Sequence, residues 1–556
     1  MASDDQQTDV PMLHPDDTRE RDACALICAV RKGGQATHGN VKRTIEALMR
    51  MGHRTGIVDG EGDGVGIMTD IPRQLWVKTL ALRNLRSSLA TDPNFWVAHV
   101  MIPVDRRYDA NQIIDTLCRM ITSEGLDILY DDAGKVDRHA LGKSAQANEP
   151  LFWQIAGMNG RVAPERLESV IYRLQRRAER ELDIHFPSFS SRSVVYKVQG
   201  TVEILQRYYP ELRDPDYTST VTLGHARYST NTNPVFERAQ PFNVLGHNGE
   251  FNTVSRFRLE AEQLGIWLNP GNSDSQDVDA LIDALCMEHN LSLIEAMEFV
   301  FPPFSHDLIT NSPEIHQLYE DIRHSFGPFA QGPAAVAARV GDQVVFSVDA
   351  LGLRPLWFGE TEKEIFATSE RGVYSLDMMT VDPRPLAPGE KMAVIINPGR
   401  AIEVMDYPAI QRYMLQKSPL GYGGRGSNGH KATGEYGAVM VGGGGGIAAA
   451  SADSIAEPES AAIRPAAWNE SAAALNTTTL GALGWERYHI SIIETLAETQ
   501  KEQVGALGWD GPLAAFSQTR VNLADYFKET VAVVTNPAID REREQAQFST
   551  TVYVGA

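Results

Sequence analysis

The chain contains few of the residues that mark several common classes of protein. Only four of its 556 residues are cysteine, and 51 basic residues are outnumbered by 72 acidic ones, for a formal net charge of −21. Four cysteines in a chain of this length do not form the disulfide framework of a small secreted protein. The acidic excess argues against nucleic acids and anionic membranes as partners, because both require basic patches.

Long apolar runs and targeting signals are scarce as well. The uncharged stretch Tyr436–Ala452 is dominated by glycine and is shorter than the roughly 20 apolar residues of a membrane-spanning helix. Residues 1–23 are polar and acidic and have no apolar core, which is not typical of a signal or transit peptide. Cys24 and Cys28 have no second cysteine pair or histidine cluster, which argues against a metal site. We expect a cytoplasmic protein without contact to a membrane.

An apolar content of 43% is sufficient for a large core, and its pattern predicts both helices and strands. Helical faces recur in Asn40–His53, with Asn40 as the expected N-cap, and along residues 113–121 and 167–182. Strand candidates are Leu26–Val30, Phe95–Pro103, Val194–Val198, Val221–Tyr228, Asn243–His247, Ala334–Val340, Gln343–Val348, Glu364–Thr368 and Lys391–Ile396. Strands and helices do not alternate strictly, so an α+β fold with layered antiparallel sheets is favoured over a doubly wound sheet.

The composition changes abruptly near residue 418. Residues 418–480 consist largely of Gly, Ala, Ser, Thr and Asn, which predicts a flexible linker. Regular patterning resumes at Trp485–Thr499, where the apolar spacing predicts a helix. We therefore divide the chain into a leader (1–23), a main domain (24–417), the linker (418–480) and a small α/β segment (481–556).

Cys24 is a candidate nucleophile. A lone cysteine is more often a buried structural thiol, so the other motifs must support a reactive role. A thiol attacks a carbonyl carbon as the thiolate, and the α-amine of an N-terminal cysteine can serve as its base, with a pKa of roughly 7.7–8.0. This mechanism requires a cut before Cys24, because an amide nitrogen is not a base.

Asn248-Gly249 has two compatible interpretations. Asn-Gly is a strong hairpin signal, and Asn243–His247 could pair with Phe251–Val254 around it. A turn that presents a backbone N–H beside an amide side chain would also form an oxyanion hole. In that arrangement the Asn248 side chain and the Gly249 N–H would stabilise the negative oxygen of a reaction intermediate.

Arg227 and Asp274 have the charges that a free α-amino acid requires. Arg227 follows an apolar strand pattern and could grip a carboxylate, although a structural ion pair would explain it too. Asp274 follows Ser273, with Gln276 at the third position of a capping box, so it could equally mark only a helix start. Together the two would bind the carboxylate and the ammonium group of one ligand.

These stretches together resemble the glutamine-binding domain of class II glutamine amidotransferases, and most of all that of glutamate synthase. The similarity is carried by Cys24, by His53-Arg54 with the Gly62-Asp63-Gly64 loop, and by the runs His225–Thr232, Arg238–Pro241, His247–Thr253, Ser273–Ser275, Asp349–Pro355 and Ser369–Val373. After the linker, Ala497–Glu502 and Val534–Pro537 resemble the start of the glutamate synthase central domain.

The resemblance implies a four-layer αββα N-terminal-nucleophile hydrolase fold. It also implies that Cys24 forms a thioester with glutamine, that Asn248 and Gly249 make the oxyanion hole, and that Arg54, Arg227, Thr230 and Asp274 bind the substrate. Glutamine would be hydrolysed to glutamate and ammonia, and the ammonia would serve glutamate synthesis. Ala25 departs from the family pattern, which usually has glycine after the nucleophile.

Nothing in the chain resembles the flavin-binding barrel of glutamate synthase or its iron–sulfur cysteines. We therefore expect no cofactor in this chain, and FMN and an iron–sulfur cluster on a separate synthase subunit onto which residues 481–556 dock. The alternatives are an amidotransferase that serves a different ammonia acceptor and a non-catalytic glutamine-binding or scaffold subunit.

Overall fold

The computed structural model describes residues 24–58, 61–227, 234–251, 254–303, 312–397, 399–417 and 487–499. The chain separates into two compact units, one of residues 1–426 with 533–556 and one of residues 427–532. The second unit is described only through helix α13 (Arg487–Thr499), which confirms the helix predicted there. The predicted leader, the linker and residues 500–556 lie outside the described residues, so those boundaries stay predictions.

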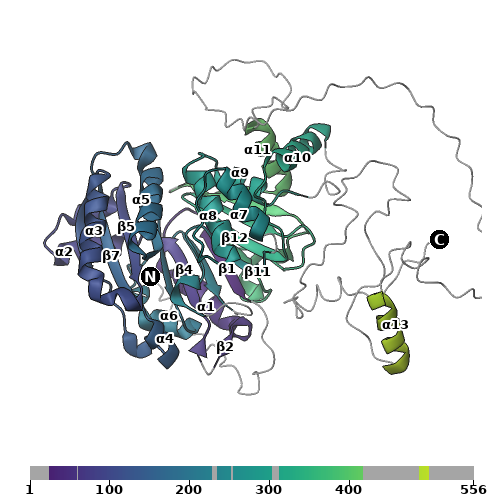
Figure 1. Ribbon diagram of the computed structural model, residues 1–556, viewed down its shortest axis with the longest axis horizontal. Helices are drawn as coiled ribbons and strands as arrows, with labels where there is room; N and C mark the ends of the chain where they lie inside the picture. The colour runs from purple at the N-terminus through teal and green to yellow at the C-terminus, as the bar shows by residue number, and fades with distance from the viewer. Residues whose placement is uncertain are drawn as a thin grey trace, which may run out of the picture. The chain divides into compact units, whose positions relative to one another are not determined.

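Two antiparallel sheets form the centre of the first unit (Figure 1). In spatial order, the larger sheet contains β16 (Met379–Pro385), β14 (Trp357–Thr361), β15 (Glu364–Thr368), β1 (Ala25–Arg31), β10 (Val221–Ala226), β4 (Val65–Asp70) and β9 (Ser193–Val198). The second sheet contains β11 (Leu245–Gly249), β12 (Ala334–Val340), β13 (Gln343–Val348), β17 (Lys391–Ile395) and β18 (Glu403–Met405). A short ladder joins β2 (Ile57–Val58) to β3 (Glu61–Gly62).

Helices flank these sheets along the chain. They are α1 (His38–Arg50), α2 (Arg73–Leu82), α3 (Ala110–Ser123), α4 (Lys143–Asn148), α5 (Leu167–Leu182), α6 (Val202–Tyr208), α7 (Val254–Gln263), α8 (Asp274–Met287), α9 (Leu293–Val300), α10 (Pro313–Ser325) and α11 (Tyr407–Lys417). Alternation along β1 shows how the layers form. Ala25, Ile27 and Ala29 pack in one core with α1 and α6, whereas Leu26, Cys28 and Val30 pack in another with β12, β13 and β17.

The second sheet repeats this arrangement on its outer face. Alternate residues of β12 pack with α7, α8, α9 and α11 in a third core, while the others face the larger sheet. The layers are therefore helices, sheet, sheet and helices, and the predicted αββα architecture is confirmed. Cys28 lies between the two sheets, where burial raises the pKa of its thiol to about 12, so it is a structural residue.

A third sheet lies beside this body and was not predicted as such. It contains β6 (Leu126–Ala133), β7 (Leu151–Asn159), β5 (Phe95–Ile102) and β8 (His185–Ser190). Helices α3 and α5 cover one of its faces. Helices α5 and α8 lie side by side (Figure 1), which joins this region to the outer helix layer of the second sheet.

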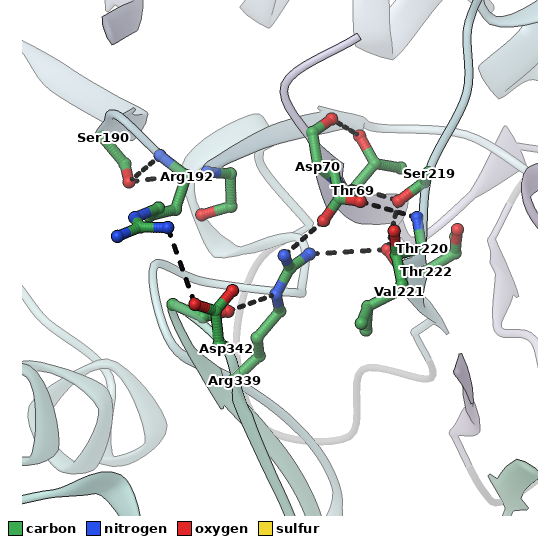
Figure 2. A network of polar contacts seen from close by, with 12 residues as sticks. Thr69, Asp70, Ser190, Arg192, Ser219, Thr220, Val221, Thr222, Arg339 and Asp342 are labelled. Carbon is green, nitrogen blue, oxygen red and sulfur yellow. Dashed lines mark hydrogen bonds and ion pairs between the residues drawn. The ribbon is translucent and has the colours of Figure 1, made fainter. Parts of the chain in front are cut away.

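Arg339 on β12 links the two central sheets (Figure 2). Its guanidinium forms an ion pair with Asp70 at the end of β4, and it donates a hydrogen bond of 3.4 Å to the Val221 carbonyl at the start of β10. Asp70 also accepts a 2.6 Å hydrogen bond from the Thr220 N–H. Because β10 runs from Val221 towards Arg227, this link lies at the end of the strand remote from Arg227.

Several local predictions were wrong in detail. The N-cap of α1 is Thr37, not Asn40, whose buried side chain instead donates to the Ala29 carbonyl and to Glu364. The hairpin alternative for Asn248-Gly249 was also wrong. Both residues lie within β11, which pairs with β12, and Val254 begins a helix.

Candidate active site

Cys24 directly precedes β1 at one end of the larger sheet. Ala25 pairs with Ala226 of β10 in the antiparallel register. Cys24 and Arg227, each one residue beyond this pair, are therefore brought to the same end of the sheet. Cys24 is partly exposed, whereas Ala25 has no exposed surface.

The Ser369 side chain fixes the main chain around Cys24. Its Oγ accepts a 3.0 Å hydrogen bond from the Leu26 N–H and donates one of 3.4 Å to the Cys24 carbonyl. The Ser369 N–H in turn donates to the Leu26 carbonyl at 2.8 Å. Sequence reasoning included Ser369 in a family motif but gave it no role, since nothing in the sequence brings two segments 345 residues apart together.

Arg227 is held through its backbone and buried beside acidic groups. Its N–H donates to the Gly64 carbonyl at 2.7 Å, and its own carbonyl accepts from the Gly56 N–H at 3.0 Å. Burial lowers the pKa of Arg227, and the nearby charges of Cys24, Asp63 and Asp274 act in the opposite direction. The predicted nucleophile and both predicted charged partners thus lie within electrostatic reach of one another.

Arg54 is oriented by a glutamate. Its Nε donates to Glu370 at 2.5 Å, and His53 Nε2 lies 2.7 Å from the same carboxylate oxygen. Burial raises the pKa of Glu370, but the His53 hydrogen bond and the Arg54 charge outweigh this effect and leave it lowered. Arg54 Nη1 is buried without a hydrogen-bond partner among the described residues. One edge of the guanidinium is therefore available to a ligand.

Asn248 and Gly249 are the last residues of β11. Asn248 is only 1% exposed, and its Nδ2 has no hydrogen-bond partner in the described structure. A buried donor without a partner is costly, and a ligand oxygen at this position would satisfy it. Gly249 has φ +121°, and an added Cβ would lie 1.8 Å from the Pro333 oxygen, so only glycine fits there.

Arg354 lies at the candidate site, and sequence reasoning assigned it no role there. It is 3% exposed, and its Nε and Nη1 have no hydrogen-bond partner among the described residues. Burial lowers its pKa, while the charge of Cys24 raises it, which places the guanidinium close to the thiol. The Asp349 carboxylate fixes its loop by accepting from the Leu353 N–H at 3.1 Å and the Arg354 N–H at 3.2 Å. The Asp-x-x-Gly-x-Arg-Pro motif was the available signal.

Asp274 begins α8, and the predicted capping box of Ser273 and Gln276 is present. The Asp274 carboxylate accepts a 2.8 Å hydrogen bond from the Ser275 N–H and one of 3.4 Å from the Phe251 N–H. The second contact ties the start of α8 to the chain just beyond Gly249. Asp274 is thus both a helix-start residue and a negative charge near Arg227.

Three further predictions concern Thr230, metal binding and membrane-spanning helices. Thr230 lies outside the described residues. The described part of the chain contains no group of three or more His, Cys, Asp or Glu side chains that could hold a metal ion. Within the same ranges, the structure has no helix of the length and apolar character needed to cross a membrane.

Comparison with known proteins decides the family. The family model of class-II glutamine amidotransferases matches residues 24–421 and begins at Cys24. The chain belongs to this family. A second model, the glutamate synthase central domain, matches residues 478–556. The prediction of a glutamine amidotransferase with the start of a glutamate synthase central domain is confirmed.

Named relatives point to the same subgroup. The chain is 30% identical to ferredoxin-dependent glutamate synthase 2 of Synechocystis sp., over 96% of this chain and 34% of that protein. It is 28% identical to the glutamate synthase [NADPH] large chain of Azospirillum brasilense, over 98% of this chain and 35% of the relative. The chain thus spans about a third of the length of the curated relatives it matches.

Among solved structures, the glutamine phosphoribosylpyrophosphate amidotransferase from B. subtilis, complexed with ADP and GMP, matches at 14% identity. The match has a TM-score of 0.26 and covers 56% of this chain and 49% of that one. The αββα fold is shown by the layers described above and agrees with the family.

Proposed function

We propose that this chain hydrolyses the side-chain amide of glutamine to glutamate and ammonia. The observation that carries the proposal is the position of Cys24 at the end of the sheet, within reach of the charges of Arg227 and Arg354. At the end of β11, the Asn248 amide is also buried, and its Nδ2 has no hydrogen-bond partner among the described residues. Family membership supplies the reaction class.

The reaction would proceed through a thioester. The Cys24 thiolate attacks the amide carbon, and the oxygen takes up negative charge beside Asn248 Nδ2 and the Gly249 N–H. Collapse of this intermediate breaks the C–N bond and releases ammonia with the proton taken from the thiol. Water then attacks the thioester, releases glutamate and returns a proton to Cys24.

Substrate binding follows from the charges around the thiol. Arg227 would pair with the α-carboxylate of glutamine and Asp274 with its ammonium group, and Arg54 Nη1 would donate a further hydrogen bond. Thr230 belongs to the substrate-binding set by resemblance. A peptide-bound glutamine would leave Arg227 or Asp274 without its counter-charge, so free glutamine is favoured.

Activity would require removal of residues 1–23. The α-amine of Cys24 can accept the thiol proton only when it is not part of a peptide bond. The family match begins at residue 24, which supports a mature chain that starts there. Cleavage by the chain's own chemistry is the simplest route.

The ammonia would serve a glutamate synthase reaction. Reduction of the imine formed from 2-oxoglutarate and ammonia needs a redox cofactor, since cysteine and carboxylates supply no electrons. We expect FMN and an iron–sulfur cluster outside the region described here, on a separate synthase subunit or on a longer chain like those of the relatives. In α13, Ile493 and Leu496 are 42% and 45% exposed, which is consistent with docking of residues 481–556. A cytoplasmic location stays a prediction.

The test combines intact mass with a glutaminase assay. We expect the purified protein to begin at Cys24 and to release ammonia from glutamine. Cys24→Ala should abolish this activity, whereas Cys118→Ala, which changes a partly exposed thiol on α3, should leave it unchanged. Full activity of a preparation that retains residues 1–23 would refute the role of the α-amine. An inactive protein that still binds glutamine would favour the scaffold alternative.

A further inference from the structure

A cavity of about 560 Å³ lies between α5 with β8 on one side and α8 with the 235–243 loop on the other. None of the predicted site residues lines it. Its lining carries the cations Arg176, Lys197 and Arg238 and the carboxylates of Glu179, Asp183, Glu237 and Asp279. The neighbouring helices α5 and α8 can be followed in Figure 1. A polar cavity of this size is large enough for a small metabolite.

Lys197 places an ammonium group in the wall of the cavity. Its side chain has no exposed surface, and its Nζ donates to the main-chain oxygen of Glu237 at 3.1 Å. An ammonium group has three N–H donors, and among the described residues this carbonyl is its one hydrogen-bond acceptor. Burial lowers the pKa of Lys197 to about 8 against the opposing charges of Glu237, Asp279 and Glu179, so the charged form would gain from a further negative partner.

Arg238 adds a second cation. It is partly buried, and its guanidinium makes no hydrogen bond or ion pair with the residues that the structure describes. The charge of Arg238 also acts to lower the pKa of Arg227, so the two guanidinium groups lie within electrostatic reach of each other. Two further nitrogens of lining residues, Arg176 Nε and His185 Nε2, are buried without a hydrogen-bond partner.

The acidic side chains of the cavity offset these cations only in part. The Asp279 carboxylate accepts backbone hydrogen bonds of 2.9 Å from Val244 and Leu245. Glu179 pairs with Arg176 at 3.1 Å. Glu237 directs its main-chain oxygen to Lys197, and its carboxylate makes no hydrogen bond or ion pair with the described residues. The groups with an unused hydrogen-bonding atom among the described residues are therefore two arginines, the His185 ring, which burial keeps neutral by lowering its pKa, and the Glu237 carboxylate.

We propose that this cavity is a second ligand site that binds a small organic carboxylate through Arg238 and Lys197. A guanidinium binds a carboxylate through two parallel hydrogen bonds, and the ammonium group would supply a third contact. Both a dicarboxylate and an α-amino acid have this chemistry. Only the amino acid would also place an ammonium group near Glu237.

The test measures binding of succinate, L-glutamate and inorganic phosphate to the purified protein by calorimetry. We expect saturable binding of succinate or L-glutamate, weakened about tenfold or more by Arg238→Gln, because one partner of a charge pair is lost. The control is Arg180→Gln. Arg180 lies on α5 over the Trp267 ring and outside the cavity, so its variant should bind like the wild type.

Variants of Lys197 and Glu237 test the other proposed contacts of the ligand. Lys197→Met should also weaken binding, and circular dichroism establishes that each variant is folded. If the natural ligand is an amino acid, Glu237→Gln should weaken the binding of L-glutamate more than the binding of succinate. If it is a dicarboxylate, Glu237→Gln should weaken the binding of neither. The proposal fails if neither carboxylate saturates below about 10 mM, if phosphate binds as tightly as both, or if Arg238→Gln binds like Arg180→Gln.

Discussion

His225 Nε2 lies 2.9 Å from the main-chain oxygen of His247 and donates a hydrogen bond to it. His225 is on β10 and pairs with Leu26 of β1, two residues from Cys24. His247 directly precedes Asn248 on β11. This one contact therefore joins the strand beside the nucleophile to the strand of the proposed oxyanion hole, across the two central sheets.

The first prediction concerns this hydrogen bond between His225 and His247. Burial lowers the pKa of His225 far below its usual value, so its ring is neutral and donates from Nε2. His225→Ala would free the His247 carbonyl and let Asn248 shift relative to Cys24. We expect kcat for glutamine hydrolysis to fall about 10²-fold, the effect of a displacement near 1 Å.

The control for this prediction is His139→Ala, which changes an exposed histidine on a 3₁₀ turn and should leave kcat unchanged. A His225→Ala protein with reduced thermal stability but wild-type kcat would show that the contact has a purely structural role.

The second prediction concerns Asn248. Its Nδ2 has no partner in the described structure, so under the proposed role Asn248→Ala would remove a donor that stabilises only the transition state. We expect kcat to fall about 10²–10³-fold with little change in the free energy of unfolding. Asn40→Ala provides the contrast, because the Asn40 side chain donates to Ala29 and Glu364 and accepts from Thr222.

For Asn40→Ala we expect a loss of about 1–3 kcal/mol in the free energy of unfolding and an unchanged kcat per folded molecule. Kinetics and denaturant unfolding of both variants separate the two cases. If Asn248→Ala loses stability as Asn40→Ala does and keeps its kcat, the oxyanion assignment is wrong.

The layers of the fold were predictable because each depends on local periodicity. Strands such as Ala334–Val340 and Gln343–Val348 were bounded correctly, since their apolar runs end at turn residues. Strand β4 was not predicted, because a strand buried on both faces shows no alternating pattern and this one follows a glycine-dense loop. The hairpin predicted at Asn248-Gly249 was wrong because the partner strand, β12, lies about 85 residues further along the chain.

Residue types that imply chemistry by themselves, a thiol, an arginine and an aspartate, led to candidates that the structure brings together, namely Cys24, Arg227 and Asp274. Ser369 and Arg354 were missed because their roles come from packing. The Ser369 hydroxyl acts through its hydrogen bond to the Cys24 carbonyl. Arg354 is positioned by the loop that the Asp349 carboxylate holds. No spacing in the sequence contains these contacts.

The third prediction concerns the affinity for glutamine. Arg227→Ala would leave the substrate carboxylate without its proposed cation and Asp274 without a nearby positive charge. We expect the loss of a buried charge pair, roughly 2–5 kcal/mol, to appear as a higher KM with a smaller change in kcat. Steady-state kinetics measure this, with Arg207→Ala on α6 as the control. A change confined to kcat would assign Arg227 to the chemical step instead.

The last prediction is a pH dependence of stability. His99 is fully buried, its Nδ1 donates to the Val195 carbonyl at 2.9 Å, and its Nε2 lies 3.3 Å from Gln154 Nε2, from which it accepts. Protonation of Nε2 would therefore destroy an acceptor. Burial lowers the pKa of His99 to about 4, against an unfolded value near 6.5.

A histidine with a lowered pKa binds fewer protons in the folded state than in the unfolded one. Its contribution to stability is then complete above about pH 6.5 and is lost as the pH falls towards 4. This shift corresponds to about 3 kcal/mol, as an upper bound. We expect His99→Gln to be less stable than the wild type at pH 7 and to approach it near pH 4.5, as measured by urea unfolding at each pH. The control is His139→Gln, which changes an exposed histidine and should not lower the stability at pH 7. A stability difference for His99→Gln that stays constant between pH 7 and 4.5 would mean that His99 does not titrate as its burial requires.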